Sequence, residues 1–309
     1  MNRNLTFFLL PIVALLFCAC KPKFTKEEVS KGEINPTRFV MIGGGHTAGY
    51  MDDALYNEGQ ENSLANLISK QLALVGGEQT FYQALVSPNS VGIGLTGFAR
   101  FILGFKTDCK GVEALSPLRI SSAGDASILS VNTYNSMQKF QNFGIPGLKL
   151  NYVSTPNYGS INPFFGRMAS STTTTVLSDA LASEPTFFSV FLGIEDVLDF
   201  AKSGGTDDNM PTVSAFENDY TEVVESLLNN GAKGVLAKIP DITKMPYFTT
   251  IPWNGLSLDE ENSISLNNFY NQLGYSFQIG INPFMIVDSS ANIFAVKEKI
   301  VNFTESLPC

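Results

Sequence analysis

The chain has 309 residues, of which 44% are hydrophobic and 16% are charged, and its net charge is −9. A disordered chain would carry more charge and fewer aromatic side chains than this one, which has 24 Phe, so we expect a folded globular protein. The acidic balance and the lack of a basic stripe in the sequence exclude nucleic acid as a partner, because binding to phosphates needs clustered Lys and Arg.

Residues 1–19 have the pattern of a bacterial lipoprotein signal peptide. Arg3 precedes an apolar run over residues 7–17, which is too short for a membrane-spanning helix of roughly 20 apolar residues. The run leads into Ala19-Cys20, and a small residue directly before a Cys resembles the lipobox of bacterial lipoproteins. We therefore predict cleavage before Cys20, acylation of its thiol and amine, and anchoring in a lipid membrane of the cell envelope, at the outer membrane or the periplasmic face. A plain secretory signal and a retained anchor helix are the alternatives.

The mature chain is expected to be more acidic and to contain few cysteines. Loss of Arg3 from the 20 Lys and Arg leaves 19 of them against 29 Asp and Glu, a net charge of −10. Besides Cys20, the mature chain keeps Cys109 and Cys309, which could form a disulfide in an oxidising envelope, and two separate thiols are the alternative. With one His and no pair of cysteines at zinc-binding spacing, the sequence predicts neither a metal site nor a cofactor, and it fixes no oligomeric state.

A polar tether over residues 20–36 leads into a domain over residues 37–309 in which strands and helices alternate. The predicted strands cover residues 38–42, 187–192, 235–239 and 284–287, and the predicted helices cover residues 62–74, 215–230 and 259–273. This alternation implies an α/β fold with a mostly parallel sheet that is covered by helices on both faces. Residues 85–185 are less regular, and we predict long loops there with one helix near residues 172–182.

Sites in such sheets form at the carboxyl ends of the strands, which here are residues 43–47, 193–196 and 240–241. Four motifs follow one another in this order at or near these positions: Gly43-Gly44-Gly45-His46-Thr47-Ala48-Gly49-Tyr50, Asn142-Phe143-Gly144-Ile145-Pro146-Gly147, Asn162-Pro163-Phe164-Phe165-Gly166-Arg167 and Gly193-Ile194-Glu195-Asp196. Together they resemble the SGNH/GDSL hydrolases, and in particular a branch found in lipoproteins of Bacteroidetes-type bacteria. The resemblance runs from about residue 38 to the end of the chain. It implies a three-layer, flavodoxin-like α/β/α domain that lacks its C-terminal elements, and ester hydrolysis as the family's activity.

The residues that the resemblance assigns to catalysis are largely replaced in this chain. The position of the nucleophilic Ser holds Gly45, and the position of the Asn that donates to the oxyanion holds Glu195, whose ionised carboxylate only accepts hydrogen bonds. The family's C-terminal Asp-x-x-His motif has no counterpart, because His46 is the only His. Gly147 matches the oxyanion glycine of the second motif, where the backbone N–H acts.

We therefore expect catalysis to be impaired, because the members of a catalytic triad act as a unit. The expected role is that of an envelope protein that binds or scaffolds a glycan or acyl-ester ligand. The alternative is a genuine SGNH-type ester hydrolase, acting on carbohydrate or lipid esters through unrecognised residues or represented here by a truncated copy.

Three other kinds of site are conceivable at the predicted strand ends, but the residues favour none of them. His46 with Thr47 could form a base and a nucleophile, Glu195 with Asp196 could form a carboxylate pair, and His46 with both carboxylates could bind a metal. Neighbouring residues seldom face each other, Asp196 is expected to be a structural hydrogen-bonding residue, and the metal set lacks motif spacing. We expect Asp241 to cap a turn. Candidates for stacking on a sugar ring, each with packing under a loop as the expected role, are Trp253, Tyr247, Phe248, Tyr50, Tyr56 and Tyr158.

Overall fold

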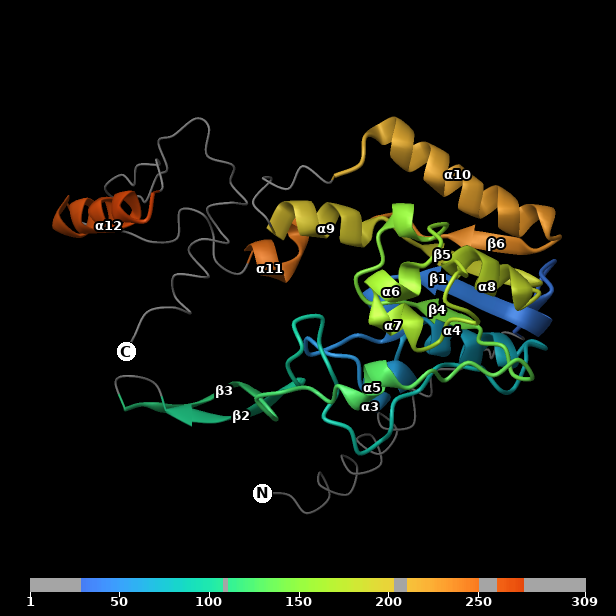
Figure 1. Cartoon of the computed structure of the whole chain (residues 1–309), viewed down its shortest axis with the longest axis horizontal. Helices are drawn as coiled ribbons and strands as arrows, with labels where there is room; N and C mark the ends of the chain where they lie inside the picture. The colour runs from blue at the N-terminus through green and yellow to red at the C-terminus, as the bar shows by residue number, and fades with distance from the viewer. Residues whose placement is uncertain (1–28, 108–110, 203–209, 250–259, 275–309) are drawn as a thin grey trace, which may run out of the picture.

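The computed structural model describes residues 29–107, 111–202, 210–249 and 260–274 of the chain (Figure 1). Its body is an α/β domain with a four-stranded sheet in the order β4-β1-β5-β6, and all three strand pairs are parallel. The predicted α/β class and the mostly parallel sheet flanked by helices are confirmed. A second sheet of two strands, β2 and β3, forms an antiparallel hairpin that projects from this body (Figure 1).

Strands and helices alternate along much of the chain. The strands are β1 (Phe39–Gly43), β2 (Phe101–Thr107), β3 (Glu113–Arg119), β4 (Asn142–Gly144), β5 (Phe187–Phe191) and β6 (Lys233–Leu236). The longer helices are α4 (Leu64–Ala73), α8 (Val176–Ala182), α9 (Ile194–Lys202), α10 (Val213–Asn229) and α12 (Glu260–Gln272). Short helical turns are η1 (Pro36–Arg38), α2 (Gly45–Ala48), α3 (Asn57–Glu61), α5 (Ser127–Ser130), η2 (Leu150–Tyr152), α6 (Tyr158–Ile161), α7 (Pro163–Gly166), η3 (Ile242–Lys244) and α11 (Pro246–Thr249).

Strand β1 lies in the middle of the sheet and separates two apolar layers. Successive side chains of a strand point to opposite faces. Val40 and Ile42 accordingly pack in the cluster that contains Val223 and Leu227 of α10. Phe39 and Met41 pack in the other cluster, with Ala65, Leu64 and Ile68 of α4. Helices α10 and α4 therefore cover opposite faces of the sheet, as Figure 1 shows.

Helices α4 and α10, both predicted, begin at side chains that cap them. The Ser63 hydroxyl accepts a hydrogen bond from the Asn66 N–H at 3.2 Å at the start of α4, and the Thr212 hydroxyl accepts one from the Ala215 N–H at 3.2 Å at the start of α10. Such caps satisfy backbone donors that have no partner inside the helix. Helix α4 ends just before Gly76, whose φ of +97° suits glycine.

Residues 85–185 differ from their prediction. Only the helix expected near residues 172–182 is found there as such, as α8, whereas the region also contains the hairpin, β4 and several short helices. Strand β4 has three residues, too few for a period of two to be visible, and its pairing with β1 is what makes it a strand. The predicted strand over residues 284–287 lies outside the described residues.

Candidate functional site

The motifs at the carboxyl ends of β1 and β5 are brought together by the pairing of these two strands. Gly43, the last residue of β1, pairs with Phe191, the last residue of β5. The turns that follow, one into α2 and one into α9, are therefore neighbours. The backbone N–H of Gly45 donates a hydrogen bond to Glu195 Oε1 at 3.0 Å, across 150 residues of sequence.

Glu195 fills the space beside the glycines of the first motif. A Cβ placed on Gly44 would lie 2.7 Å from Glu195 Oε1, so a side chain at position 44 would require Glu195 to move. A Cβ placed on Gly45 would lie 3.4 Å from Glu195 Oε1 and 3.5 Å from the Cβ of Tyr50, which are ordinary contacts. Position 45 therefore has room for a small side chain, and a serine there would point at a carboxylate.

His46 and Thr47 do not form a base and a nucleophile. The His46 side chain is exposed, and its ring centre lies 5.8 Å from that of Phe191. Thr47 is fully buried, and its hydroxyl has no hydrogen-bond partner among the described residues. One side chain thus lies in solvent and the other in the interior.

Glu195 and Asp196 lie in the first turn of α9 instead of at the end of a strand, which corrects our placement of these residues. Asp196 is buried, and its Oδ2 accepts a hydrogen bond from the Leu150 N–H at 3.1 Å. Burial raises the pKa of the Asp196 carboxyl, while the hydrogen bond from Leu150 opposes this shift. The two carboxylates accept hydrogen bonds from different segments, Glu195 from the Gly45 backbone and Asp196 from the Leu150 backbone, so they do not act as a pair.

Two asparagines that sequence reasoning left without a role hold the second motif in place. The Asn142 side-chain amide donates to the Thr47 carbonyl at 3.0 Å, and its carbonyl accepts from the Gly144 N–H at 2.9 Å. The Asn162 amide donates to the Pro146 carbonyl at 2.9 Å. Gly147 follows with a φ of +74°, where glycine is favoured. Both asparagines belong to the quoted motifs, and this was the only signal in the sequence that pointed to them.

Arg167, which ends the third motif, is a buried structural cation. Its guanidinium donates to the carbonyls of Ile128 at 3.1 Å, Ala84 at 2.6 Å and Leu85 at 3.2 Å. Burial lowers the pKa of Arg167 to about 10, so the group remains charged at neutral pH. It ties the loop around residue 84 and helix α5 to the end of α7, and it is buried.

The aromatic candidates and Asp241 have mostly structural roles. Tyr158 is 2% exposed and stacks on Tyr152 with ring centres 5.0 Å apart, so it cannot stack on a sugar. The Tyr50 hydroxyl donates to Asp53 at 3.0 Å and accepts from the Leu95 N–H at 3.1 Å. The Tyr56 hydroxyl donates to Asp52 at 2.6 Å.

Asp241 caps η3 by accepting from the Thr243 N–H at 3.1 Å, as expected. Hydrogen bonds from the Thr243 hydroxyl and then from the Thr243 N–H lower the pKa of Asp241. Phe248 is buried and Tyr247 is exposed, with their rings edge to face. Cys20, Cys109, Trp253 and Cys309 lie outside the described residues.

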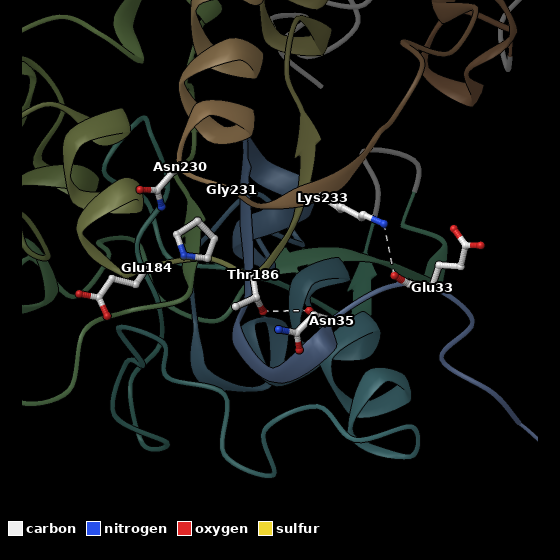
Figure 2. A pocket seen from close by; sticks show the side chains of 8 residues that line it. Glu33, Asn35, Glu184, Thr186, Asn230, Gly231 and Lys233 are labelled. Atoms are coloured by element: carbon white, nitrogen blue, oxygen red, sulfur yellow. Dashed lines mark hydrogen bonds between the residues drawn. The ribbon is translucent and has the colours of Figure 1, made fainter.

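An open pocket lies at the opposite end of the sheet (Figure 2). It has a volume of about 360 Å³ and is lined by Glu33, Asn35, Glu184, Pro185, Thr186, Asn230, Gly231 and Lys233. Two of its polar side chains bond to backbone carbonyls: Lys233 Nζ donates to the Glu33 carbonyl at 3.5 Å, and the Thr186 hydroxyl donates to the Asn35 carbonyl at 2.8 Å. The pocket is open, and most of its lining side chains are exposed, so they do not converge on one point. It therefore has no feature of a catalytic site.

Comparison with other proteins adds no functional assignment: no protein family, curated protein or solved structure matches the chain. Within the described ranges, no three His, Cys, Asp or Glu side chains are grouped so as to hold a metal ion, and no helix is long and apolar enough to cross a membrane.

Proposed function

We propose that this chain is a lipid-anchored envelope protein with an SGNH-hydrolase-like domain that binds a ligand without hydrolysing it. The observation that carries the proposal is the hydrogen bond from the Gly45 N–H to Glu195 Oε1 at 3.0 Å. Ester hydrolysis needs backbone or side-chain donors directed at a developing oxyanion. Here a donor at the strand end is occupied by a carboxylate of the chain itself, whose negative charge would repel that oxyanion.

The remaining parts of a hydrolytic site fail for independent reasons. Gly45 provides no nucleophile, and the exposed His46 is the only imidazole of the chain. Loss of one oxyanion donor typically lowers kcat by ~10²–10³, and loss of a triad member leaves only residual catalysis. These losses together place ester hydrolysis at the uncatalysed background.

The same carboxylate favours a ligand that donates hydrogen bonds. Glu195 is half-buried, and among the described residues no Lys, Arg or His forms an ion pair with it. An ionised carboxylate accepts hydrogen bonds at both oxygens. Sugar hydroxyls are donors of this kind, which supports a glycan or acylated glycan as the ligand.

Hydrolysis of p-nitrophenyl acetate tests the absence of catalysis. We expect the mature polypeptide, residues 20–309 with Cys20→Ser, to show no more turnover than its heat-denatured form. The double variant Gly45→Ser with Glu195→Asn restores a hydroxyl and an amide donor but no base, so we expect it to remain at background as well. Turnover by the folded wild-type sequence that disappears on denaturation would contradict the proposal and favour the ester hydrolase.

Lipid attachment is tested separately. Cells that express the full chain are fed an alkyne-labelled fatty acid, and the label is expected on the wild-type chain and not on the variant Cys20→Ser. An unlabelled wild-type chain in the soluble envelope fraction would favour plain secretion.

A further inference from the structure

The two faces of the β2–β3 hairpin differ in their exposed apolar side chains. Its seven residue pairs run from Phe101 opposite Arg119 to Thr107 opposite Glu113. Because side chains alternate along a strand, one face carries the adjacent pairs Leu103–Pro117 and Phe105–Leu115. The other face carries Ile102–Leu118, Gly104–Ser116 and Lys106–Ala114. On the first face, Phe101–Arg119 lies at the base of the hairpin and Thr107–Glu113 lies toward its tip. We call Leu103, Phe105, Leu115 and Pro117 the apolar strip.

The apolar strip lies in water in the isolated chain. Leu103 is 71% exposed, Phe105 is 70% exposed and Leu115 is 59% exposed. Figure 1 shows the hairpin extending away from the α/β body, with no helix laid across it. Grouped apolar side chains on the surface mark an interaction site, and a two-stranded hairpin is only marginally stable without a covering partner.

The hairpin is nevertheless fixed at its base, so the strip has a set direction relative to the body. Arg119 forms an ion pair with Asp53 at 2.6 Å and donates to the Ala99 carbonyl at 2.6 Å. Its guanidinium lies 3.7 Å from the ring centre of Phe101, whose N–H donates to the Asp52 carbonyl at 2.8 Å. These contacts attach the base of the hairpin to the body.

We propose that the apolar strip inserts shallowly into the surface of the lipid membrane that holds the Cys20 anchor. This inference rests on the proposed lipid anchor. The nine residue steps from Cys20 to Val29 span at most roughly 30 Å, so the anchor keeps the domain beside the bilayer and raises the effective concentration of the hairpin there.

The size and shape of the strip favour lipid over a protein partner. A stable protein interface uses roughly 20–30 residues on each side, whereas the strip offers four side chains on a projecting ribbon. Insertion is limited to the boundary between headgroups and acyl chains, because the outer edges of β2 and β3 carry backbone groups that need water. With a net charge of −10 once residues 1–19 are removed, the chain gains little from anionic lipids, so apolar contact supplies the attraction.

Vesicle flotation tests this proposal without the acyl chains. The mature polypeptide with Cys20→Ser is mixed with phosphatidylcholine vesicles, and we expect part of it to float with the lipid. The variant Leu103→Ser with Phe105→Ser is expected to partition at least about tenfold less. Val213, which is 85% exposed on α10, provides the matched control, and Val213→Ser is expected to float like wild type. Higher salt is expected to leave partitioning unchanged, because the contact is apolar.

Two further measurements keep the test decisive. Phe105→Trp places an indole in the strip, and its fluorescence is expected to be quenched by brominated phosphatidylcholine beyond the signal of Trp253, the one native Trp. Wild-type protein that stays with the vesicle-free fraction, or a strip variant that floats equally well, would overturn the proposal. The proposal would also be overturned if the wild-type protein sediments as a dimer without lipid while the strip variant sediments as a monomer. The strip would then be covered by a second copy of the chain. Neither result depends on the hydrolysis or fatty-acid labelling experiments, so failure of the proposed function is distinguishable.

Discussion

Strand β1 and the β2–β3 hairpin are built from similar side chains and lie in opposite environments. Phe39, Val40, Met41 and Ile42 are at most 3% exposed, whereas Leu103 and Phe105 are about 70% exposed. Strand β1 has a strand on each side and a helix layer on each face, while β2 pairs with β3 alone. The difference shows that an apolar strand is buried only where enough neighbouring strands and helices cover it. Strand β1 has such neighbours within the chain, and the hairpin does not.

The largest effect should come from removing the same side chain in the two regions. Phe188 on β5 is 1% exposed, and Phe188→Ala is expected to lower the free energy of unfolding by about 3–5 kcal/mol through lost contacts and a cavity. Phe105→Ala on the hairpin is expected to change it by no more than about 0.5 kcal/mol. Urea denaturation of both variants checks the comparison, and equal losses would mean that the hairpin is buried in solution.

Arg167 in the body and Arg119 at the base of the hairpin should also differ in how much they contribute to the free energy of unfolding. Arg167→Gln removes a buried guanidinium from three carbonyls, and we expect a loss of about 2–4 kcal/mol because buried acceptors are left without donors. Urea denaturation measures this loss as a lower unfolding midpoint, with an unchanged dependence of the free energy of unfolding on urea concentration. A loss smaller than that of Arg119→Gln would contradict the structural role of Arg167.

Arg119→Gln, at the base of the hairpin, should cost less. The pair with Asp53 is partly exposed, with 24% and 41% of the two side chains accessible, and exposed ion pairs contribute about 0–1 kcal/mol. We expect little change in the unfolding midpoint but faster hydrogen exchange at the amides of β2 and β3. Unchanged exchange would show that Phe101 and the Ala99 contact suffice to hold the hairpin.

The smallest change in the free energy of unfolding is expected for Asp196→Asn. Unlike the other variants, it should be stabilising at neutral pH. Burial raises the pKa of Asp196 above its unfolded value, so the native state binds a proton more tightly than the unfolded state. Stability contributed by the protonated group is therefore lost as the pH rises from the unfolded pKa through the folded one. Asp196→Asn keeps an oxygen for the Leu150 N–H and carries no charge, so the variant is expected to be slightly more stable at neutral pH. Stability curves against pH should converge at acid pH, and a constant difference would contradict this assignment.

Elements with a clear period could be predicted from the sequence. The spacing of Leu64 and Ile68, with Ser63 as the capping residue, predicts α4, and the apolar runs ending in glycine predict β1 and β5. In each of these cases the local pattern and the final environment agree. Strand β4 and the hairpin escaped prediction because a three-residue strand has no period and because the hairpin's apolar residues are not buried in the chain.

For the candidate site, the sequence by itself determined the chemistry that is missing: Gly45 has no hydroxyl, Glu195 has no N–H to donate, and His46 is the only imidazole. Only the tertiary structure decided how the remaining groups are used. The pairing of β1 with β5 sets Gly45 against Glu195, and the adjacent Thr47 and Asp196 point into the interior. Contacts across 150 residues depend on which strands become neighbours, and that choice is made by the packing of whole layers, which no local pattern encodes.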